Sequence, residues 1–251
     1  MTTMDIHRKV NLETEWMAAT ARRAIDILIA CAGLVLLAPL MALLVLAVWI
    51  EGGRPAFFSQ VRIGQAGQPF RIFKFRKFAK DCGTNGCGVT IKCDRRLTRL
   101  GGFLERTKLD ELPQLWNILR GDMSMAGPRP ESLTFVDCFA GGYKAVLRHK
   151  PGLFGPSQFY FRDEGALYPA GLDPERFYRE VLFPLKADID LAYFPQRTLA
   201  ADFGWIIRGI LIVFGLRLMP AEAFDVIREK FVSGVAESSC TQTSPQSRGN
   251  T

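Results

Sequence analysis

The longest apolar stretch of this chain covers residues 27–50 and contains no charged residue. A helix needs about 20 consecutive apolar residues to cross the hydrocarbon core of a bilayer, so this stretch is long enough to enter a membrane. Helices buried in soluble proteins seldom present apolar side chains on every face over such a length. The pattern therefore predicts a membrane helix.

Basic residues flank this stretch on both sides, with Arg22 and Arg23 before it and Arg54 after it. Because such residues concentrate on the cytoplasmic side of a membrane, both ends are expected on that side. Pro39, near the middle, removes one backbone hydrogen bond and bends a helix. The residues alone leave two arrangements open: a re-entrant helix that dips into one leaflet and returns, and a tilted spanning helix that tolerates its proline.

A second apolar stretch, residues 203–218, is shorter and is interrupted by Arg208. Together with Trp205 and the flanking Arg217, it is typical of an interfacial helix that lies on the membrane surface. A helix buried in the core of a domain would give a similar pattern, and this alternative stays open.

Shorter segments between the two apolar stretches predict a small domain. Two β-prone segments meet at a glycine-containing turn, residues 64–67, which predicts a β-hairpin. Alternation in its second strand places four side chains on one face, Phe70, Ile72, Lys74 and Arg76. Helical segments are expected at residues 95–106, broken at Gly101 and Gly102, at residues 132–149 and at residues 173–192.

A further helix is predicted directly after an acidic pair, Asp110 and Glu111. Apolar residues at spacings of three, four and seven indicate one buried face made of Leu112, Leu115, Trp116 and Leu119. Pro113 fits the first turn, where a residue without an N–H loses no helical hydrogen bond. From residue 238 onward the chain is rich in Ser, Thr, Gln and Gly, and we expect disorder there.

The chain of 251 residues has a net charge of +7 and a sequence pI of about 9.2. Anionic partners are therefore expected, and charge alone does not choose among nucleic acid, phosphorylated metabolites and an acidic membrane surface. The uncharged stretch at residues 27–50 argues against a nucleic-acid-binding protein, which would present its basic residues on a soluble helix or an aromatic platform.

The six cysteines do not predict a disulfide framework, because one of them, Cys31, lies in the apolar stretch and no cleavable secretory signal precedes it. Cys82, Cys87 and Cys93 form the one cluster, and their spacing differs from that of common zinc sites. Reduced thiols are favoured over a metal site here.

The acidic pair has two interpretations. Asp110 could cap the following helix, with Glu111 complementing the helix dipole. Alternatively, a helix start surrounded by cations is a phosphate site, and a carboxylate held there with a lowered pKa could bind Mg²⁺ or attack phosphorus. The number of basic residues nearby favours the second interpretation: Arg99, Arg106, Lys108, Arg120 and Arg129.

At these residues the chain resembles a known family. The segment "KLDELPQLWNILRGDMSMAGPRP" closely resembles the signature of the bacterial sugar transferases, the monotopic phosphoglycosyl transferases that start cell-surface glycan assembly. The resemblance extends over about residues 20–217, through "FFSQVRIGQAGQPFRIFKFR", "KPGLFG" and "LKADIDLAYFPQRTLAADFGWII". Several motifs in the same order make it specific.

The resemblance implies a Mg²⁺-dependent transfer of a sugar-1-phosphate from a UDP-sugar to polyprenyl (undecaprenyl) phosphate, with release of UMP. The family's nucleophile falls on Asp110, which would form a covalent phosphosugar intermediate. Glu111 matches its partner, assigned to metal binding or to activation of the lipid phosphate. The family's re-entrant helix favours that arrangement for residues 27–50, with Pro39 at the bend.

Further signature positions carry over with roles at the substrates. Arg106 is expected to bind phosphate, Asp122 to support the site and Arg129 to bind the donor. Lys74 and Arg76 match the family's "KFR" element. In "GPSQFYFR" the chain keeps Gln158 and Arg162 but departs from the family at Pro156, Tyr160 and Phe161, so the donor sugar is not predicted.

The predicted fold class is α+β and mostly helical, with a re-entrant membrane helix hairpin and a small cytoplasmic catalytic domain that has a β-hairpin and interfacial helices. The expected parts are a lead-in at residues 1–21, the membrane helix at 22–54, the catalytic domain at 55–218 and an extension at 219–251. The expected location is the cytoplasmic face of the bacterial inner membrane, with no nucleic acid partner and homo-oligomer formation left open. A catalytically silent membrane-anchored assembly factor of the same fold is the alternative function.

Overall fold

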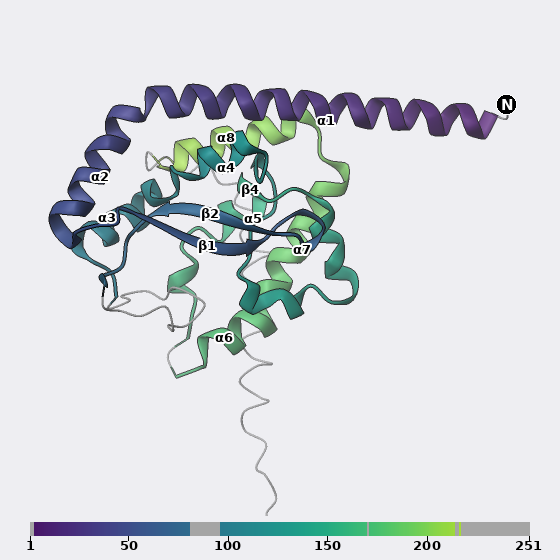
Figure 1. The fold of residues 1–251 in the computed structure, drawn as a ribbon. Coiled ribbons are helices and arrows are strands. Elements are labelled where there is room, and N and C mark those ends of the chain that lie inside the picture. The colour runs from purple at the N-terminus through teal and green to yellow at the C-terminus, as the bar shows by residue number, and fades with distance from the viewer. Residues whose placement is uncertain (1–2, 81–95, 170, 214–215, 217–251) are drawn as a thin grey trace, which may run out of the picture.

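The computed structural model describes residues 3–80, 96–169, 171–213 and 216, with side chains described from residue 16 onward. It starts with two long helices, α1 (Thr3–Leu36) and α2 (Ala38–Gly52), that meet at a bend of 60° (Figure 1). Helix α1 runs without a break through residue 21. Within the described residues, neither helix alone is long and apolar enough to cross a membrane. Trp16–Leu36 and Ala38–Gly52 have the necessary length and apolar composition only when they are taken together as a bent pair.

The bend lies at Leu37, two residues before Pro39. The amide of Leu37 still donates to Gly33 O at 2.9 Å, and the amide of Met41 donates to Leu37 O at 2.8 Å. Pro39 has no N–H, so the helical hydrogen bond to the carbonyl of Val35 is missing between these two. Pro39 itself lies in the first turn of α2, where it costs that helix nothing.

The predicted hairpin is confirmed. Strands β1 (Phe57–Ile63) and β2 (Pro69–Phe75) pair antiparallel, from Phe57 opposite Phe75 to Ile63 opposite Pro69. The turn between them contains the short 3-10 helix η1 (Gln65–Gly67). Alternation along β2 buries Ile72 and leaves Lys74 on the same face of the strand.

Helix α3 (Arg99–Thr107) is continuous, so the predicted break at Gly101 and Gly102 is wrong. A Cβ atom on Gly101 would lie 1.9 Å from the backbone oxygen of Lys77. The glycine is therefore needed for close contact between α3 and the chain that follows β2, at a modest cost in helix propensity.

Helix α4 (Gln114–Arg120) follows the acidic pair, but its buried face differs from the predicted one. Leu115 and Ile118 are buried, together with Gln114 and Asn117, whereas Trp116 is 50% exposed. The prediction for Trp116 is wrong because the polar Asn117 occupies the interior. Its Oδ1 accepts from the amide of Phe73 at 3.0 Å and its Nδ2 donates to Arg71 O at 2.7 Å, which fixes α4 to β2.

A short parallel pair was not predicted from the sequence. Strands β3 (Ser124–Ala126) and β4 (Gly152–Phe154) have three residues each, too few for a periodic pattern. They approach closely because Gly127 and Gly152 lack side chains: a Cβ atom on Gly152 would lie 2.0 Å from Gly127 N.

The second half of the described chain is helical. The predicted helix at residues 132–149 is instead a pair of 3-10 helices, whereas residues 173–192 are helical as predicted, with a π-helical turn. These elements are η4 (Leu133–Cys138), η5 (Gly141–Arg148), α5 (Pro156–Tyr160), η6 (Glu164–Ala166), α6 (Pro174–Phe177), the π-helix η7 (Tyr178–Leu182), α7 (Phe183–Tyr193), η8 (Phe194–Gln196) and α8 (Leu199–Val213).

The core connects the bent helix pair to the rest of the molecule. One buried cluster joins Ala30 of α1 to Ile72 of β2, to Ile118 of α4 and to Ile206 of α8. Another joins Leu44 and Val48 of α2 to the hairpin and to α3. Helices α1, α4 and α8 consequently lie against one another in Figure 1.

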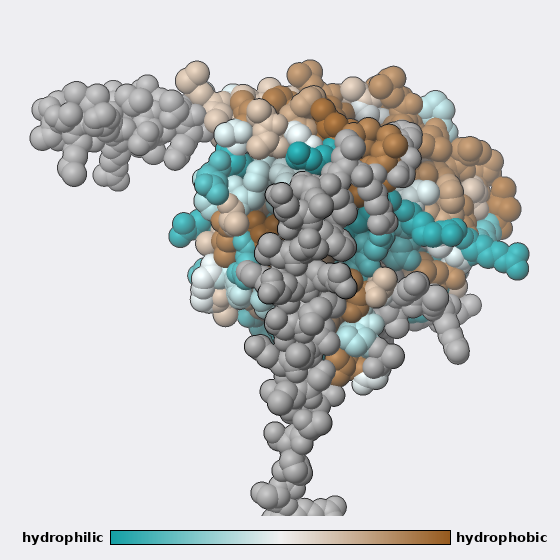
Figure 2. All heavy atoms as spheres, turned by 180° about the vertical axis from the view of Figure 1, so that it is seen from behind, coloured by the Kyte–Doolittle hydropathy of each residue, from teal (hydrophilic) through white to brown (hydrophobic). Residues whose placement is uncertain are grey.

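A large apolar surface remains exposed. Figure 2 shows hydrophobic side chains gathered along the edge formed by the bent helix pair. On α1 and α2 they include Leu36, Leu43 and Ile50, which are 76%, 61% and 79% exposed. Helix α8 is buried on one side, because Ile206 lies in the core while Phe203 is 52% exposed, and the interfacial position of this helix stays a prediction.

Two sequence-based predictions fall on residues outside the described part of the chain. They are the thiol cluster of Cys82, Cys87 and Cys93, and the disorder predicted from residue 238 onward.

Candidate active site

The acidic pair lies in a tight turn between two helices. Helix α3 ends at Lys108, whose backbone is left-handed with φ of 60°, and the 3-10 turn η3 (Leu109–Glu111) follows at once. A left-handed conformation costs about 1 kcal/mol or more in a residue other than glycine and is common where a site fixes its backbone. The amide of Glu111 donates to Lys108 O at 3.1 Å, which closes this turn.

Asp110 does not cap α4. The residue before that helix is Pro113, and no side chain caps its start. The Asp110 side chain points into the protein and is 3% exposed, and its Oδ1 has no hydrogen-bond partner among the described residues. A buried polar atom without a partner is costly, so this oxygen is a strong indication of a functional role.

Glu111 is held by two cations from distant parts of the chain. Its Oε1 lies 2.7 Å from Lys74 Nζ on β2 and 3.6 Å from Arg129 Nη2 in the loop after β3. Burial alone would raise the pKa of Glu111, but Lys74, Arg129 and Lys108 lower it below its usual range. Glu111 is therefore ionised at neutral pH.

The pKa values of these two cations, Lys74 and Arg129, are shifted in opposite directions. Burial lowers the pKa of Lys74 to about 8, against the opposing effect of Glu111. Burial would also lower the pKa of Arg129, but Glu111, Glu131 and Glu164 raise it. Arg129 is thus a permanent positive charge, whereas Lys74 can lose its proton just above neutral pH.

The expectation of a lowered pKa holds for Glu111 and is wrong for Asp110. Burial raises the pKa of Asp110, and the neighbouring Glu111 adds to the effect, although Lys74 opposes it. The physical reason is the distribution of contacts, since Lys74 and Arg129 both contact Glu111 and leave Asp110 buried beside a second carboxylate.

The acidic pair has some of the features of a binding site for a divalent cation. Within the described residues no group of three or more His, Cys, Asp or Glu side chains is arranged to hold a metal ion. Mg²⁺, however, is commonly bound by one or two carboxylates together with substrate phosphates and water. The unpaired Oδ1 of Asp110 and the adjacent Glu111 match that pattern.

Arg106 and Arg162 lie together at one side of this turn. Arg162 Nη2 donates to the backbone oxygen of Arg106 at 2.9 Å. The Arg106 side chain is exposed and its Nε donates to Gly102 O at 3.2 Å within α3. The structure thus brings together two residues that are 56 positions apart in the sequence.

Three other predicted site residues hold neighbouring segments in place, two through backbone oxygens and one through a side chain. Arg76 Nη2 donates to Gly53 O at 2.6 Å and so attaches the end of α2 to β2. Asp122 Oδ2 accepts from Asn117 Nδ2 at 3.2 Å, at the opposite end of α4 from Asp110. Gln158 Nε2 donates to Gly127 O at 2.8 Å and to Gly152 O at 3.2 Å, which fixes the loop that carries Arg129.

Gln158 is in turn supported by a buried aspartate that the sequence analysis missed. Ser157 is fully buried, and its Oγ lies 3.0 Å from both Gln158 Oε1 and Asp190 Oδ2 on α7. Asp190 is 5% exposed, its Oδ1 has no partner, and burial raises its pKa to about 7.

A buried charged cluster behind Arg129 was also missed. It contains Glu131, Glu164, Lys186 and Tyr178, from four different segments of the chain. Glu131 directly follows the quoted segment that ends in "GPRP", and Lys186 lies within the quoted segment that begins with "LKADIDLAYF"; the sequence analysis assigned neither residue a role. Only the fold brings them together.

Helix α1 is attached to the site by polar contacts. Arg23 donates to Ile118 O at 2.6 Å and to Leu119 O at 2.8 Å, at the C-terminal end of α4. Asp26, one residue before the uncharged stretch, accepts from Met125 N at 2.8 Å and Ser124 Oγ at 3.1 Å on β3. Arg22 pairs with Asp202 of α8 at 3.0 Å.

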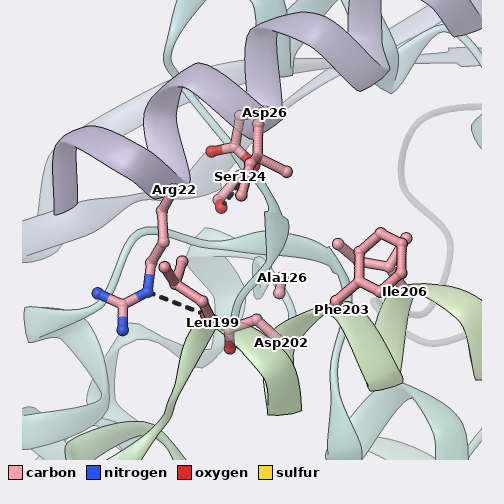
Figure 3. A pocket seen from close by; sticks show the side chains of 9 residues that line it. Arg22, Asp26, Ser124, Ala126, Leu199, Asp202, Phe203 and Ile206 are labelled. Atoms are coloured by element: carbon pink, nitrogen blue, oxygen red, sulfur yellow. Dashed lines mark hydrogen bonds and ion pairs between the residues drawn. The ribbon is translucent and has the colours of Figure 1, made fainter. Parts of the chain in front are cut away.

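Figure 3 shows Arg22, Asp26 and Ser124 around a small cavity between α1, β3 and α8. Its volume of about 20 Å³ has room for one water molecule and none for a substrate. The contacts around it join helices, and we assign no substrate site to it.

Comparison with known proteins identifies a matching family and several relatives. Residues 17–215 match the sequence model of a family described as bacterial sugar transferase. The chain is 34% identical, over 197 residues, to the UDP-N-acetylgalactosamine-undecaprenyl-phosphate N-acetylgalactosaminephosphotransferase of Aeromonas hydrophila, a match that covers 74% of this chain and 45% of the relative.

Two further relatives are similar over the same region. The chain is 40% identical over 142 residues to the UDP-glucose:undecaprenyl-phosphate glucose-1-phosphate transferase of Caulobacter vibrioides, covering 55% of this chain and 52% of the relative. It is 36% identical over 152 residues to the exopolysaccharide production protein PSS of Rhizobium leguminosarum, covering 57% and 74%. The chain thus spans about half the length of the first two relatives.

Asp190→Asn is expected to stabilise the protein more at pH 8 than at pH 5. The pKa of Asp190 is raised in the folded state from 3.8 to about 7. The stability contributed by this group is therefore complete below about pH 4 and is lost as the pH rises to about 7, because the folded state resists ionisation. Asparagine has the shape of aspartate but does not ionise, so the variant does not lose this stability as the pH rises.

Chemical denaturation in detergent at the two pH values measures the difference. Asp188→Asn, at an exposed position of the same helix, is the matched control and should show no such dependence. A stability gain at pH 8 that is no larger than at pH 5 would contradict the raised pKa of Asp190.

Proposed function

The chain belongs to the bacterial sugar transferase family, and from that premise we propose that it transfers a sugar-1-phosphate from a UDP-sugar to undecaprenyl phosphate, as the first membrane step of surface-glycan synthesis. The main supporting observation is Asp110, buried with an unpaired carboxylate oxygen beside Glu111, Lys74 and Arg129. The relatives named for this reaction, with two different sugars, support the reaction class and leave the sugar open.

In the first half-reaction an oxygen of Asp110 attacks the phosphorus that bears the sugar. The bond from that phosphorus to the bridging oxygen breaks, and UMP leaves with this oxygen. The product is a phosphosugar on the Asp110 carboxylate. Oδ1 suits this role because it accepts no hydrogen bond from the described residues, so the nucleophile is not already committed to one.

In the second half-reaction a phosphate oxygen of undecaprenyl phosphate attacks the same phosphorus. The bond between phosphorus and Asp110 breaks, which releases the lipid diphosphate sugar and restores the carboxylate. Glu111 does not act as a simple base at neutral pH, because its cation contacts hold its pKa below the usual range. Its role is to orient Lys74 and Arg129.

Both substrates are anionic, so the site must supply positive charge. Arg129 and Lys74 provide it from the protein, with Arg106 and Arg162 nearby at the exposed edge. Mg²⁺, bound by Asp110, Glu111 and the donor diphosphate, would supply further positive charge that stabilises the ionised nucleophile and offsets the charge of the phosphates.

The acceptor is a lipid, so the site must lie at a membrane surface. The exposed apolar side chains of α1, α2 and α8 support insertion of this edge into a bilayer. The 60° bend and the basic residues on both flanks support a re-entrant arrangement at the cytoplasmic face of the inner membrane.

Asp110→Asn should reduce transfer by at least about 100-fold while the protein folds and binds membranes, because the amide keeps the shape and is not a nucleophile. UMP release is measured with undecaprenyl phosphate and a panel of UDP-sugars. Intact-mass analysis with donor alone should detect a phosphosugar adduct on the wild type and none on the variant. Asp188→Asn is the control, and an Asp110→Asn protein that keeps more than a few per cent of activity would exclude the covalent role.

Removal of divalent cations should abolish transfer, and Mg²⁺ should restore it, because hard oxygen ligands and phosphates suit this ion. The measurement is UMP release after treatment with a chelator and re-addition of single metal salts. Full activity in the presence of excess chelator would contradict a metal at the acidic pair.

The re-entrant arrangement predicts that both flanks of residues 27–50 face the same side. In a cysteine-free variant, single cysteines at Ala19 and at Ala79, both exposed, should react with an impermeant maleimide only from the cytoplasmic side of inner-membrane vesicles. Pro39→Ala restores the missing N–H, and it should shift some molecules toward a spanning state and lower the activity. Reaction of the two positions from opposite sides would exclude the arrangement and leave the Asp110 chemistry intact.

A further inference from the structure

The charged cluster behind Arg129 is centred on Lys186 of α7. Its Nζ lies 3.0 Å from Glu131 Oε1, 3.1 Å from Glu164 Oε2 and 3.0 Å from the hydroxyl of Tyr178. Lys186 is 3% exposed and Tyr178 is 1% exposed. A buried ammonium is stable only with such partners, and all three of its donors are used here.

The cluster acts on Arg129 as well. Glu131 is two residues after Arg129, and both Glu131 and Glu164 interact electrostatically with the Arg129 guanidinium. Arg129 therefore interacts with two sources of negative charge: Glu111, at 3.6 Å, and the Glu131–Glu164 pair.

A count of charges indicates what Lys186 does. Glu131 and Glu164 together carry two negative charges when ionised, and Lys186 offsets one of them. Without Lys186, the full double charge would act on the remaining cations that interact with Glu131, which are Arg129 and Arg62, and it would attract Arg129 away from Glu111. Attraction between such charges is strong at a site with little solvent.

We propose that Lys186 is a positioning residue of this active site: by neutralising the Glu131–Glu164 pair it keeps Arg129 directed at Glu111 and available to the diphosphate of a nucleotide donor. The inference rests on the proposed function for the identity of the donor. Among the described residues, Lys186 forms ion pairs with Glu131 and Glu164 and none with Glu111. The proposal therefore assigns a role to a cluster outside the acidic pair.

A structural role for Lys186 is the competing explanation, because removing one partner of a buried ion pair destabilises a protein. The two explanations differ in how Lys186 depends on Arg129. If Lys186 acts through Arg129, its substitution should have no further effect on donor binding once Arg129 is changed, whereas general destabilisation would add to the effect of the Arg129 change.

The test measures binding of UDP, in the presence of Mg²⁺, to the purified full chain in detergent by isothermal titration calorimetry. Lys186→Met should weaken binding about tenfold, which is the typical loss for one charge-assisted hydrogen bond. Glu131→Gln should bind UDP at least as tightly as the wild type, and Glu131→Gln/Lys186→Met should return to within about threefold of it. In an Arg129→Gln background, Lys186→Met should cause no additional loss.

Arg176→Met is the control, because it breaks the exposed Arg176–Glu180 ion pair, which has no assigned role at the site, and it should leave UDP affinity unchanged. Thermal melts confirm that each variant is folded at the temperature of the titration. Wild-type affinity in Lys186→Met, weaker binding in Glu131→Gln, or additive losses in the Arg129→Gln background would each overturn the inference.

UDP binding requires neither turnover nor knowledge of the sugar, so the outcome is separate from that of the transfer assay. A wild-type protein that binds UDP and catalyses no transfer would contradict the proposed function while the Lys186 comparison still stands. A wild-type protein that transfers sugar phosphate with unchanged UDP affinity in Lys186→Met would contradict this inference alone.

Discussion

The Glu111 carboxylate, held between Lys74 and Arg129, is the contact on which the architecture of the site depends. It joins three segments that are distant in the sequence: the second strand of the hairpin, the turn after α3 and the loop after β3. The Lys74 and Glu111 side chains are 16% and 13% exposed, and loss of one partner of such a largely buried pair typically costs about 3–5 kcal/mol. Arg129 is 34% exposed, so solvent screening makes its contact with Glu111 weaker. Neither partner can therefore be lost without consequence for the fold as well as the chemistry.

This arrangement separates the two carboxylates of the acidic pair. Glu111 takes the cations and becomes a permanent anion, whereas Asp110 is buried beside it with an unpaired oxygen and a raised pKa. Two neighbouring acids with pKa values shifted in opposite directions are typical of sites that assign different roles to chemically similar groups. In the proposed reaction, the uncommitted carboxylate is the nucleophile and the committed one organises positive charge.

The bent helix pair is joined to this site by direct contacts. Arg23 of α1 binds the last carbonyls of α4, and Asp26 binds the first strand of the parallel pair. On α2, the carbonyl of Gly53 that follows the helix accepts from Arg76. Since α4 begins just after Asp110, the position of the bent helices fixes that of Asp110. In the proposed reaction, a soluble nucleotide and a lipid phosphate would have to meet at such a fixed position.

Local signals in the sequence predicted a large part of the molecule. Alternation predicted the hairpin, the apolar stretch with Pro39 predicted a bent helix, and the acidic pair among cations, with the motifs around it, led to the family. Each of these depends on residues close together in the chain, where side-chain periodicity and turn chemistry leave a readable pattern.

The tertiary structure decided the rest. The helix through Gly101 is continuous because the glycine lies against the backbone of Lys77, and Trp116 is exposed because Asn117 pairs with β2. The three-residue parallel strands depend on two glycines in separate segments. Lys186 and Glu131 lie 55 positions apart and meet only in the folded chain. The sequence by itself thus determined the hairpin, the apolar helices and the acidic pair. Which charges surround that pair was decided by long-range packing, because contacts between distant segments leave no periodic pattern in a single sequence.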